Sequence, residues 1–189
     1  LIFSVNNIDD RFSIFWHSLW CFIAYELYRK ICGDPQLKNK LVHIFMSGNY
    51  APHLNNNSEH HTEFYKLEAE GIKEELIRLG GTAKEIFDDP VFAQYFLPII
   101  RSDYYITETY EPESLEKFSC GCTVYNGLED ELTPEDLESW RVYSPCGFTI
   151  KNFSGNHFFI NDNCKMVVEH INKTLRKYNK TMRREYVKI

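Results

Sequence analysis

The sequence predicts an α/β fold in which a partial parallel sheet is flanked by helices. Residues 12–16 form a near-continuous apolar run, as expected of a strand buried on both faces. Residues 18–31 carry apolar side chains at helical spacing, and residues 41–46 form a second apolar run. A strand, a helix and a strand joined by short links are typical of a parallel βαβ unit. Because 189 residues can bury one sizeable core, we expect a single domain over residues 1–189.

Residues 56–111 are predicted to form a helical insertion between strands. A polar loop at 55–58 precedes helical patterns at 63–79, 82–87 and 90–105, and the next strand pattern begins at about residue 119. Apolar side chains that look exposed lie along residues 92–100. They fit either a lid over a lipid-like substrate or a helical subdomain with a core of its own.

The rest of the chain returns to alternating strands and helices. Gly33 to Pro35 ends the first helix, and Thr133 is the expected N-cap of a later one, with Asp136 in its first turn. In chain order, the remaining elements are a strand at 122–126, a helix at 134–143, a strand at 148–153 and an amphipathic helix at about 161–178.

Composition restricts the function classes. A net charge of −6 argues against general nucleic-acid binding, although residues 173–188 are basic and form either a solvated helix end or a docking patch for an acidic partner. The chain shows neither a signal peptide nor an apolar run near the ~18 residues of a membrane span. We therefore expect a cytoplasmic protein with no membrane association and with reduced cysteines. The oligomeric state is left open.

Two groups of possible metal ligands are weak candidates. The six cysteines show no metal spacing, since Cys120 and Cys122 are one residue short of a C-x-x-C pair. His53, Glu59, His60 and His61 lie in a polar loop without regular ligand spacing, which favours a solvated loop. Cys21, one turn after Ser18, is interpreted as a small buried thiol rather than a nucleophile.

Three side chains that can perform hydrolysis follow three predicted strands. Ser18, Asp130 and His157 each come just after a strand, and the carboxyl ends of parallel strands meet at one edge of a sheet. A serine hydroxyl needs a neighbouring base, and that base needs a carboxylate to fix its tautomer. The chain order serine, aspartate, histidine is that of the α/β-hydrolases.

Six short motifs then resemble one family. They read F-W-H-S-L-W at 15–20, I-A-Y-E-L at 23–27, S-G-N-Y-A-P at 47–52, F-L-P-I-I-R-S-D at 96–103, G-L-E-D at 127–130 and G-N-H-F-F at 155–159. In this order they are similar to motifs of the type II thioesterases, which are α/β-hydrolases that serve nonribosomal peptide and polyketide synthases. Medium-chain fatty-acyl thioesterases of fatty acid biosynthesis are related.

The resemblance implies a reaction and a role for each residue. Ser18 would be the nucleophile, Asp130 the orienting acid and His157 the general base, and the backbone N–H of Leu19 would be one oxyanion-hole donor. The substrate would be an acyl thioester on the phosphopantetheine arm of an acyl or peptidyl carrier protein. The resemblance implies neither a metal nor an organic cofactor.

The chain departs from the family at two places. Trp16 and Trp20 replace the two glycines beside the nucleophile, and forcing bulk into a packed turn costs ~1–3 kcal/mol each. We expect the indoles either to displace Ser18 or to fill a void beside an opened turn. The resemblance also implies a longer N-terminal part with the first strands and a second oxyanion donor, whose loss typically costs ~10²–10³ in rate. We therefore expect a domain that lacks its N-terminal strands.

Three functions follow from these observations. The first is an active thioesterase that uses Ser18, Asp130 and His157. The second is a non-catalytic relative that only binds the carrier protein or the acyl chain, which the two tryptophans favour. The third is a serine esterase that uses the same three residues on oxygen esters.

Overall fold

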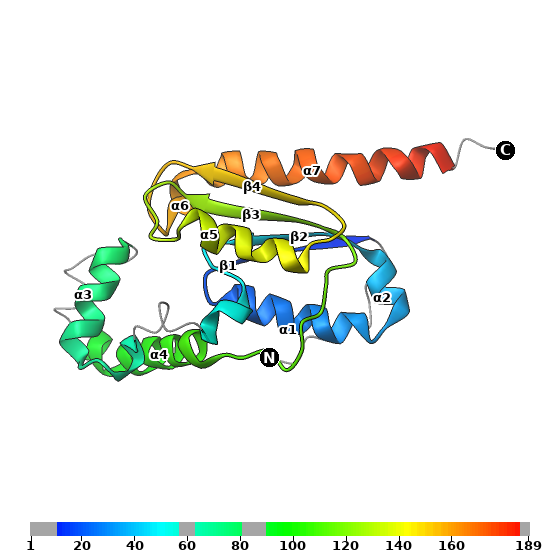
Figure 1. Cartoon of the computed structure of the whole chain (residues 1–189). Coiled ribbons are helices and arrows are strands. Elements are labelled where there is room, and N and C mark those ends of the chain that lie inside the picture. Colours follow the sequence, from blue (N-terminus) through cyan, green and yellow to red (C-terminus); the bar gives the residue numbers. More distant parts are fainter. Residues whose placement is uncertain (1–10, 57–62, 81–89, 186–189) are drawn as a thin grey trace.

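The computed structural model describes residues 11–56, 63–80 and 90–185, and its centre is a four-stranded parallel sheet. The strands are β1 (Phe12–His17), β2 (Leu41–Ser47), β3 (Gly121–Gly127) and β4 (Phe148–Phe153), and they pair in that order. In the register, His17 lies opposite Ser47, and Ser47 lies opposite Tyr125. Neighbouring strands therefore end nearly level at one edge, and the predicted α/β class is confirmed (Figure 1).

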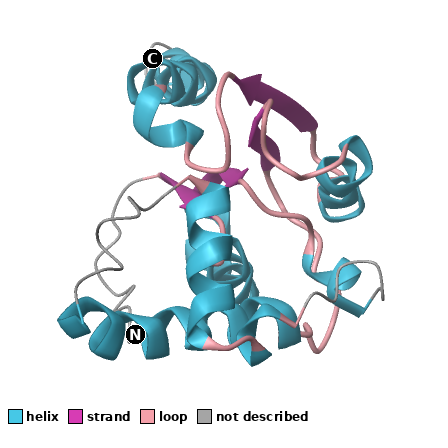
Figure 2. Ribbon diagram, turned by 90° about the vertical axis from the view of Figure 1, so that its left-hand side faces the viewer, coloured by secondary structure: helices cyan, strands magenta, loops and turns pink. Residues whose placement is uncertain are grey.

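Helices cover both faces of this sheet, as Figures 1 and 2 show. One face carries α1 (Trp20–Cys32), α5 (Pro134–Glu138) and the 3₁₀ turn η5 (Ser139–Tyr143), and the other carries α6 (Phe159–Asp162) and α7 (Cys164–Glu185). A short helix, α2 (Pro35–Lys40), joins α1 to β2. None of the described helices is long and apolar enough to cross a bilayer.

The two faces bury separate apolar cores because successive strand residues point to opposite sides. Met46 of β2 packs with α1 and with Trp140 of η5, in a core that also holds Tyr25 and Tyr28. The neighbouring residue, Phe45, packs on the other side with Phe159 and Val167. One face of the sheet is thus packed against α1 and η5, and the opposite face is packed against α6 and α7.

Most predicted elements are confirmed, but several helices differ for local reasons. The predicted helix 63–79 begins only at Ala69, because Glu63 has a left-handed backbone and residues 64–66 form a 3₁₀ turn. The first helix ends as expected, but α2 follows at once, because Asp34 accepts hydrogen bonds from Gln36 N at 2.8 Å and Leu37 N at 3.2 Å. The predicted helix 134–143 divides into α5 and η5. Its N-cap is confirmed, since Thr133 and Asp136 form a reciprocal capping box.

Between β2 and β3, the described residues form helices and 3₁₀ turns. They are η1 (Pro52–Asn56), η3 (Phe64–Lys66), α3 (Ala69–Leu79) and α4 (Pro90–Thr109). In Figure 1, α3 stands beside the end of the sheet at which β3 and β4 finish. The predicted helix at 82–87 lies outside the described residues.

Candidate active site

Ser18 occupies a sharp turn between β1 and α1. Its φ is 55°, in the left-handed region that non-glycine residues seldom adopt. The backbone on both sides is hydrogen-bonded: Ser18 N donates to Ser47 O at 2.8 Å, and Cys21 N donates to Ser18 O at 2.9 Å. The turn therefore projects the serine at the carboxyl edge of the sheet, as in a nucleophile elbow.

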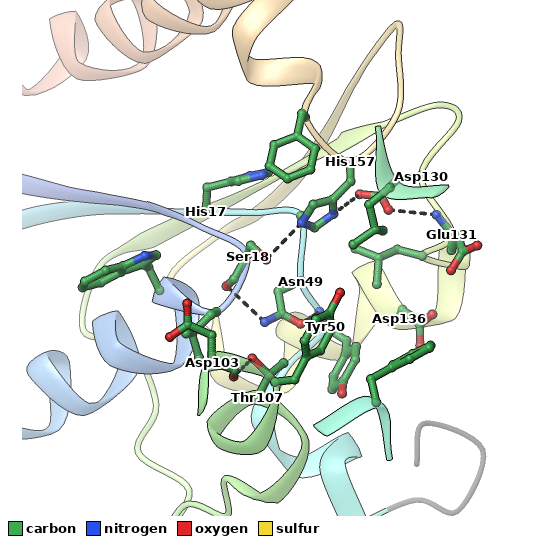
Figure 3. A pocket seen from close by; sticks show the side chains of 18 of the residues that line it. His17, Ser18, Asn49, Tyr50, Asp103, Thr107, Asp130, Glu131, Asp136 and His157 are labelled. Atoms are coloured by element: carbon green, nitrogen blue, oxygen red, sulfur yellow. Dashed lines mark hydrogen bonds and ion pairs between the residues drawn. The ribbon is translucent and has the colours of Figure 1, made fainter. Parts of the chain in front are cut away.

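The structure brings together the three side chains predicted to act on a substrate. His157 Nε2 lies 3.0 Å from Ser18 Oγ, and His157 Nδ1 lies 3.0 Å from Asp130 Oδ2 (Figure 3). Because a carboxylate can only accept, Nδ1 carries the hydrogen and Nε2 is left to accept from the serine hydroxyl. The His157 and Asp130 side chains are 13% and 4% exposed, so this chain of contacts is shielded from solvent.

The loops that carry the acid and the base are bonded to each other. Glu129 N donates to Gly155 O at 3.0 Å, and Asp130 N donates to Gly127 O at 3.1 Å. Asp130 Oδ1 accepts a further hydrogen bond from Glu131 N at 2.8 Å. Both carboxylate oxygens of Asp130 are thus engaged, which fixes the carboxylate against the imidazole.

A second histidine forms part of the wall around His157. His17 Nδ1 lies 2.9 Å from Ser47 Oγ, and the His17 and His157 ring centroids are 4.9 Å apart. Burial, and then the neighbouring His157, lower the pKa of His17 to about 4. His17 is therefore neutral near pH 7 and adds no charge to compete with an imidazolium on His157.

Gly48 allows these two rings to approach. Its φ is +62°, and a Cβ there would lie 2.7 Å from His17 Cε1 and 3.3 Å from His157 Cε1. A side chain at this position would have to displace both imidazoles. The glycine of the S-G-N-Y-A-P motif is consequently a packing requirement of the site.

Leu19 follows the serine at the N-terminus of α1. Backbone N–H groups in the first turn of a helix have no intrahelical acceptor, and the helix dipole favours negative charge there. The position suits an oxyanion-hole donor. That role for Leu19 stays a prediction.

The expected opening of the turn by the tryptophans is wrong. Trp16 and Trp20 stack on each other, with ring centroids 5.3 Å apart and an interplanar angle of 13°. Ser18 between them keeps its left-handed backbone and its contact with His157. The indoles are accommodated because they pair at the wall of the pocket, with Trp20 40% exposed, instead of entering the turn.

Ser18 and His157 open into a pocket of about 1250 Å³. Its walls come from the sheet edge and from the insertion, which contributes Leu76, Leu79, Ile100 and Tyr104. A cavity of this size is large enough to enclose most of a small-molecule ligand.

The other sequence candidates lie elsewhere. Cys21 is fully buried, and burial raises its thiol pKa to about 12, so it is a poor nucleophile. His53 packs against Tyr143, with ring centroids 5.5 Å apart, while Glu59, His60 and His61 fall outside the described residues. Within residues 11–56, 63–80 and 90–185, no three His, Cys, Asp or Glu side chains gather as a metal site.

Sequence reasoning missed two groups of residues at this site. Asn49 donates from Nδ2 to the carbonyl of Ser18 at 3.1 Å, and its place just after β2 could have indicated this. Arg78 and Glu131 form an ion pair between α3 and the loop after Asp130. Charge pairing between distant segments leaves no local pattern in the sequence.

Comparison with known proteins agrees with this geometry. A family model described as a thioesterase domain matches residues 5–175. Linear gramicidin dehydrogenase LgrE of Brevibacillus parabrevis is 32% identical over 91% of this chain and 65% of its own length, so the chain spans slightly less than two thirds of that relative.

Two solved structures are similar over most of the chain. ClbQ from the colibactin pathway superposes with a TM-score of 0.79 at 25% identity, over 94% of this chain and 74% of its own. The type II thioesterase BorB from the borrelidin cluster gives 0.75 at 26% identity, over 90% and 67%. The α/β-hydrolase fold and the resemblance to type II thioesterases are thereby confirmed. This chain belongs to the thioesterase domain family.

Proposed function

We propose that this chain hydrolyses acyl thioesters with Ser18 as nucleophile, His157 as general base and Asp130 as the orienting acid. The observation that carries the proposal is the pair of 3.0 Å contacts that link Ser18 Oγ, His157 and Asp130 at the floor of a 1250 Å³ pocket. A hydroxyl, a base and a carboxylate in this arrangement are the requirements of nucleophilic acyl transfer.

The reaction would proceed in two halves. Ser18 Oγ bonds to the thioester carbonyl carbon while its proton passes to His157 Nε2. The C–S bond then breaks, and the thiolate leaves with that proton as a thiol. Water attacks the resulting ester and gives a proton to His157, which returns it to Ser18 as the free acid departs.

Groups at the site stabilise the charges that develop on His157 and on the carbonyl oxygen. The buried Asp130 carboxylate stabilises the imidazolium that forms on His157, and the neutral His17 beside it adds no repulsion. The carbonyl oxygen becomes negative in both tetrahedral intermediates. The N–H of Leu19 at the start of α1 is the proposed donor to that oxygen.

We propose that the acyl group is presented on the phosphopantetheine arm of a carrier protein. Of the two similar structures, ClbQ comes from a nonribosomal peptide and polyketide synthase pathway, and BorB is a type II thioesterase from the borrelidin biosynthetic cluster. A mainly apolar pocket with Leu76, Leu79 and Ile100 in its wall suits an acyl chain.

We also propose that residues 56–111 act as the lid. Helices α3 and α4 supply one side of the pocket, opposite the sheet edge that carries Ser18 and His157. Without these helices the acyl chain would lie in solvent, where water weakens the electrostatic interactions of the site.

The test is thioester hydrolysis by the chain beside Ser18→Ala, with an acyl-pantetheine and an acyl carrier protein as substrates. Ser114→Ala, at an exposed position, is the matched control. We expect Ser18→Ala to lower kcat by more than about 10³-fold and Ser114→Ala to leave it unchanged.

Three outcomes would overturn the proposal. If the folded chain binds acyl-pantetheine without turnover, it is a binding protein of this fold. If it cleaves an oxygen ester faster than the matched thioester, it is a serine esterase that uses the same residues. Turnover of both substrates at rates that Ser18→Ala does not change would remove Ser18 from the mechanism.

A further inference from the structure

The C-terminal turn of α3 contacts both loops that carry the acid and the base. Arg78 of this helix pairs with Glu131, the residue after Asp130. Gly80, which ends the helix, lies against Asn156, the residue before His157. One turn of the insertion is therefore in contact with both sides of the site.

The Arg78 guanidinium is held on its own helix before it reaches the loop. Arg78 Nε donates to Glu75 Oε2 at 2.7 Å, and Nη2 donates to Glu75 Oε1 at 2.6 Å. The Glu75 side chain is 7% exposed and that of Arg78 is 42% exposed, so the buried carboxylate fixes the guanidinium through a bidentate pair. The remaining nitrogen, Nη1, is aimed at the carboxylate of Glu131.

Glu131 links Arg78 to the catalytic carboxylate of Asp130. Its side chain binds Arg78, and its backbone N–H donates to Asp130 Oδ1 at 2.8 Å, as Figure 3 shows. The other carboxylate oxygen of Asp130 is hydrogen-bonded to His157, and His157 is hydrogen-bonded to Ser18. A continuous series of contacts thus runs from α3 to the nucleophile.

The second contact is a close backbone approach. Gly80 has φ +78°, and a Cβ there would lie 2.2 Å from Asn156 Nδ2. The other end of that carboxamide, Oδ1, accepts from Phe158 N at 3.0 Å, which closes a turn around His157. The end of α3 therefore also packs on the turn that aims the base.

We propose that Arg78 is a positioning residue that holds the Asp130 loop through Glu131, so that the acid is correctly placed only when α3 is docked on the site. The inference rests on the proposed function and deepens it, because it makes the insertion part of the catalytic geometry as well as a cover. Arg78 need not touch the substrate for this role.

The test compares Glu131→Gln, Arg78→Gln and the double variant with Arg101→Gln. Arg101 is the matched control, because its guanidinium donates to Leu67 O within the insertion. We expect Glu131→Gln and Arg78→Gln to lower kcat by about 10–100-fold, with KM changed less than about threefold, because a displacement of ~1 Å at the site costs ~100-fold. The kcat of the double variant should be no lower than that of the less active single variant, because each single substitution already removes the same Arg78–Glu131 contact.

A second readout is independent of turnover. Amide hydrogen exchange of residues 127–133 should increase in Glu131→Gln and Arg78→Gln but not in Arg101→Gln. Glu131 is 63% exposed and its loss leaves the Arg78–Glu75 pair intact, so Glu131→Gln decides the matter even if Arg78→Gln unfolds α3.

The outcomes separate this inference from the proposed function. Unchanged kcat and unchanged exchange in Glu131→Gln would overturn the role of Arg78 while leaving the thioesterase intact. An inactive wild-type chain whose 127–133 loop still loosens in Glu131→Gln would overturn the proposed function and retain the coupling. Additive losses in the double variant would show that the two residues act separately, against the inference.

Discussion

Asn49 donates a hydrogen bond from its carboxamide Nδ2 to the backbone carbonyl of Ser18, over 3.1 Å. Asn49 is 5% exposed, and its other side-chain atom, Oδ1, accepts from Tyr50 N at 2.9 Å. A non-glycine residue in the left-handed region costs of the order of 1 kcal/mol and persists only where its surroundings hold it. Asn49 supplies one of those restraints on the nucleophile.

Replacing Asn49 by Asp should therefore loosen the serine turn. The variant places a carboxylate oxygen where the N–H donor stood, facing the Ser18 carbonyl. We expect kcat for thioester hydrolysis to fall about 10–100-fold, because the nucleophile is displaced. Asn152→Asp, at an exposed position of β4, is the control and should leave kcat unchanged. Equal kcat for both variants would remove Asn49 from this role.

Gly48→Ala should disturb the base. The added methyl meets His17 at 2.7 Å and His157 at 3.3 Å, so both rings must move. We expect a loss of ~1–3 kcal/mol in the free energy of unfolding, measured in urea, together with reduced kcat. Gly147→Ala also has a positive φ but open space around it, and it should lose stability without losing kcat. A Gly48→Ala chain with full kcat would contradict the packing described for His157.

Restoring glycine at Trp20 should not rescue activity. Ser18 already holds its left-handed turn and lies 3.0 Å from His157 with both indoles present. We expect kcat of Trp20→Gly to stay within about threefold of wild type, since no ~1 Å displacement has to be corrected. KM should rise for long acyl chains because Trp20 lines the pocket. A gain of tenfold or more in kcat would show that the indole had displaced the nucleophile.

Stability should fall as the pH is lowered below about 6.5, partly because of His43. This side chain is 3% exposed, and burial, followed by Lys177 and His170, lowers its pKa to about 4. The unfolded chain, with the pKa of a free histidine near 6.5, binds a proton in this window that the folded chain does not. Lowering the pH from 7.5 to 4.5 therefore favours unfolding, by a few kcal/mol at most for this group.

The pH dependence can be assigned by substitution. Urea unfolding of wild type and of His43→Gln at pH 7.5 and 5.0 gives the difference in the free energy of unfolding for each chain. The variant is expected to lose stability at both pH values, because the contacts of His43 with Thr123 and Tyr178 are altered. Its difference between the two pH values should nevertheless be smaller. An identical difference in both chains would rule out His43 as a source.

The strand pattern was sufficient to predict the central part of this site. Ser18, Asp130 and His157 could be placed together because each follows a predicted strand and parallel strands end at one edge. The fourth strand was predicted with its observed bounds, Phe148–Phe153. A strand pattern lies in contiguous residues, so it can be recognised without knowledge of the tertiary structure.

Features that depend on packing between distant segments were not predictable. The stacking of Trp16 on Trp20 depends on the position of the pocket wall, which the sequence does not reveal. Steric crowding at the turn, considered alone, suggested that the indoles would displace Ser18. The contact between Arg78 and Glu131 joins residues more than fifty positions apart. Helix α2 was missed because Pro35 was interpreted as a stop signal, whereas after the Asp34 cap it is the first residue of a new helix.

The central claim is that Ser18 attacks the thioester, and the most direct measurement is the location of the acyl group during a single turnover. The chain is mixed with an acyl-pantetheine, quenched in acid within milliseconds to seconds, digested with trypsin and analysed by mass spectrometry. We predict a transient acyl adduct on Ser18 in the peptide 12–29, absent from Ser18→Ala. An adduct on Cys21 of that peptide, or thioester loss at the same rate in Ser18→Ala, would contradict the account.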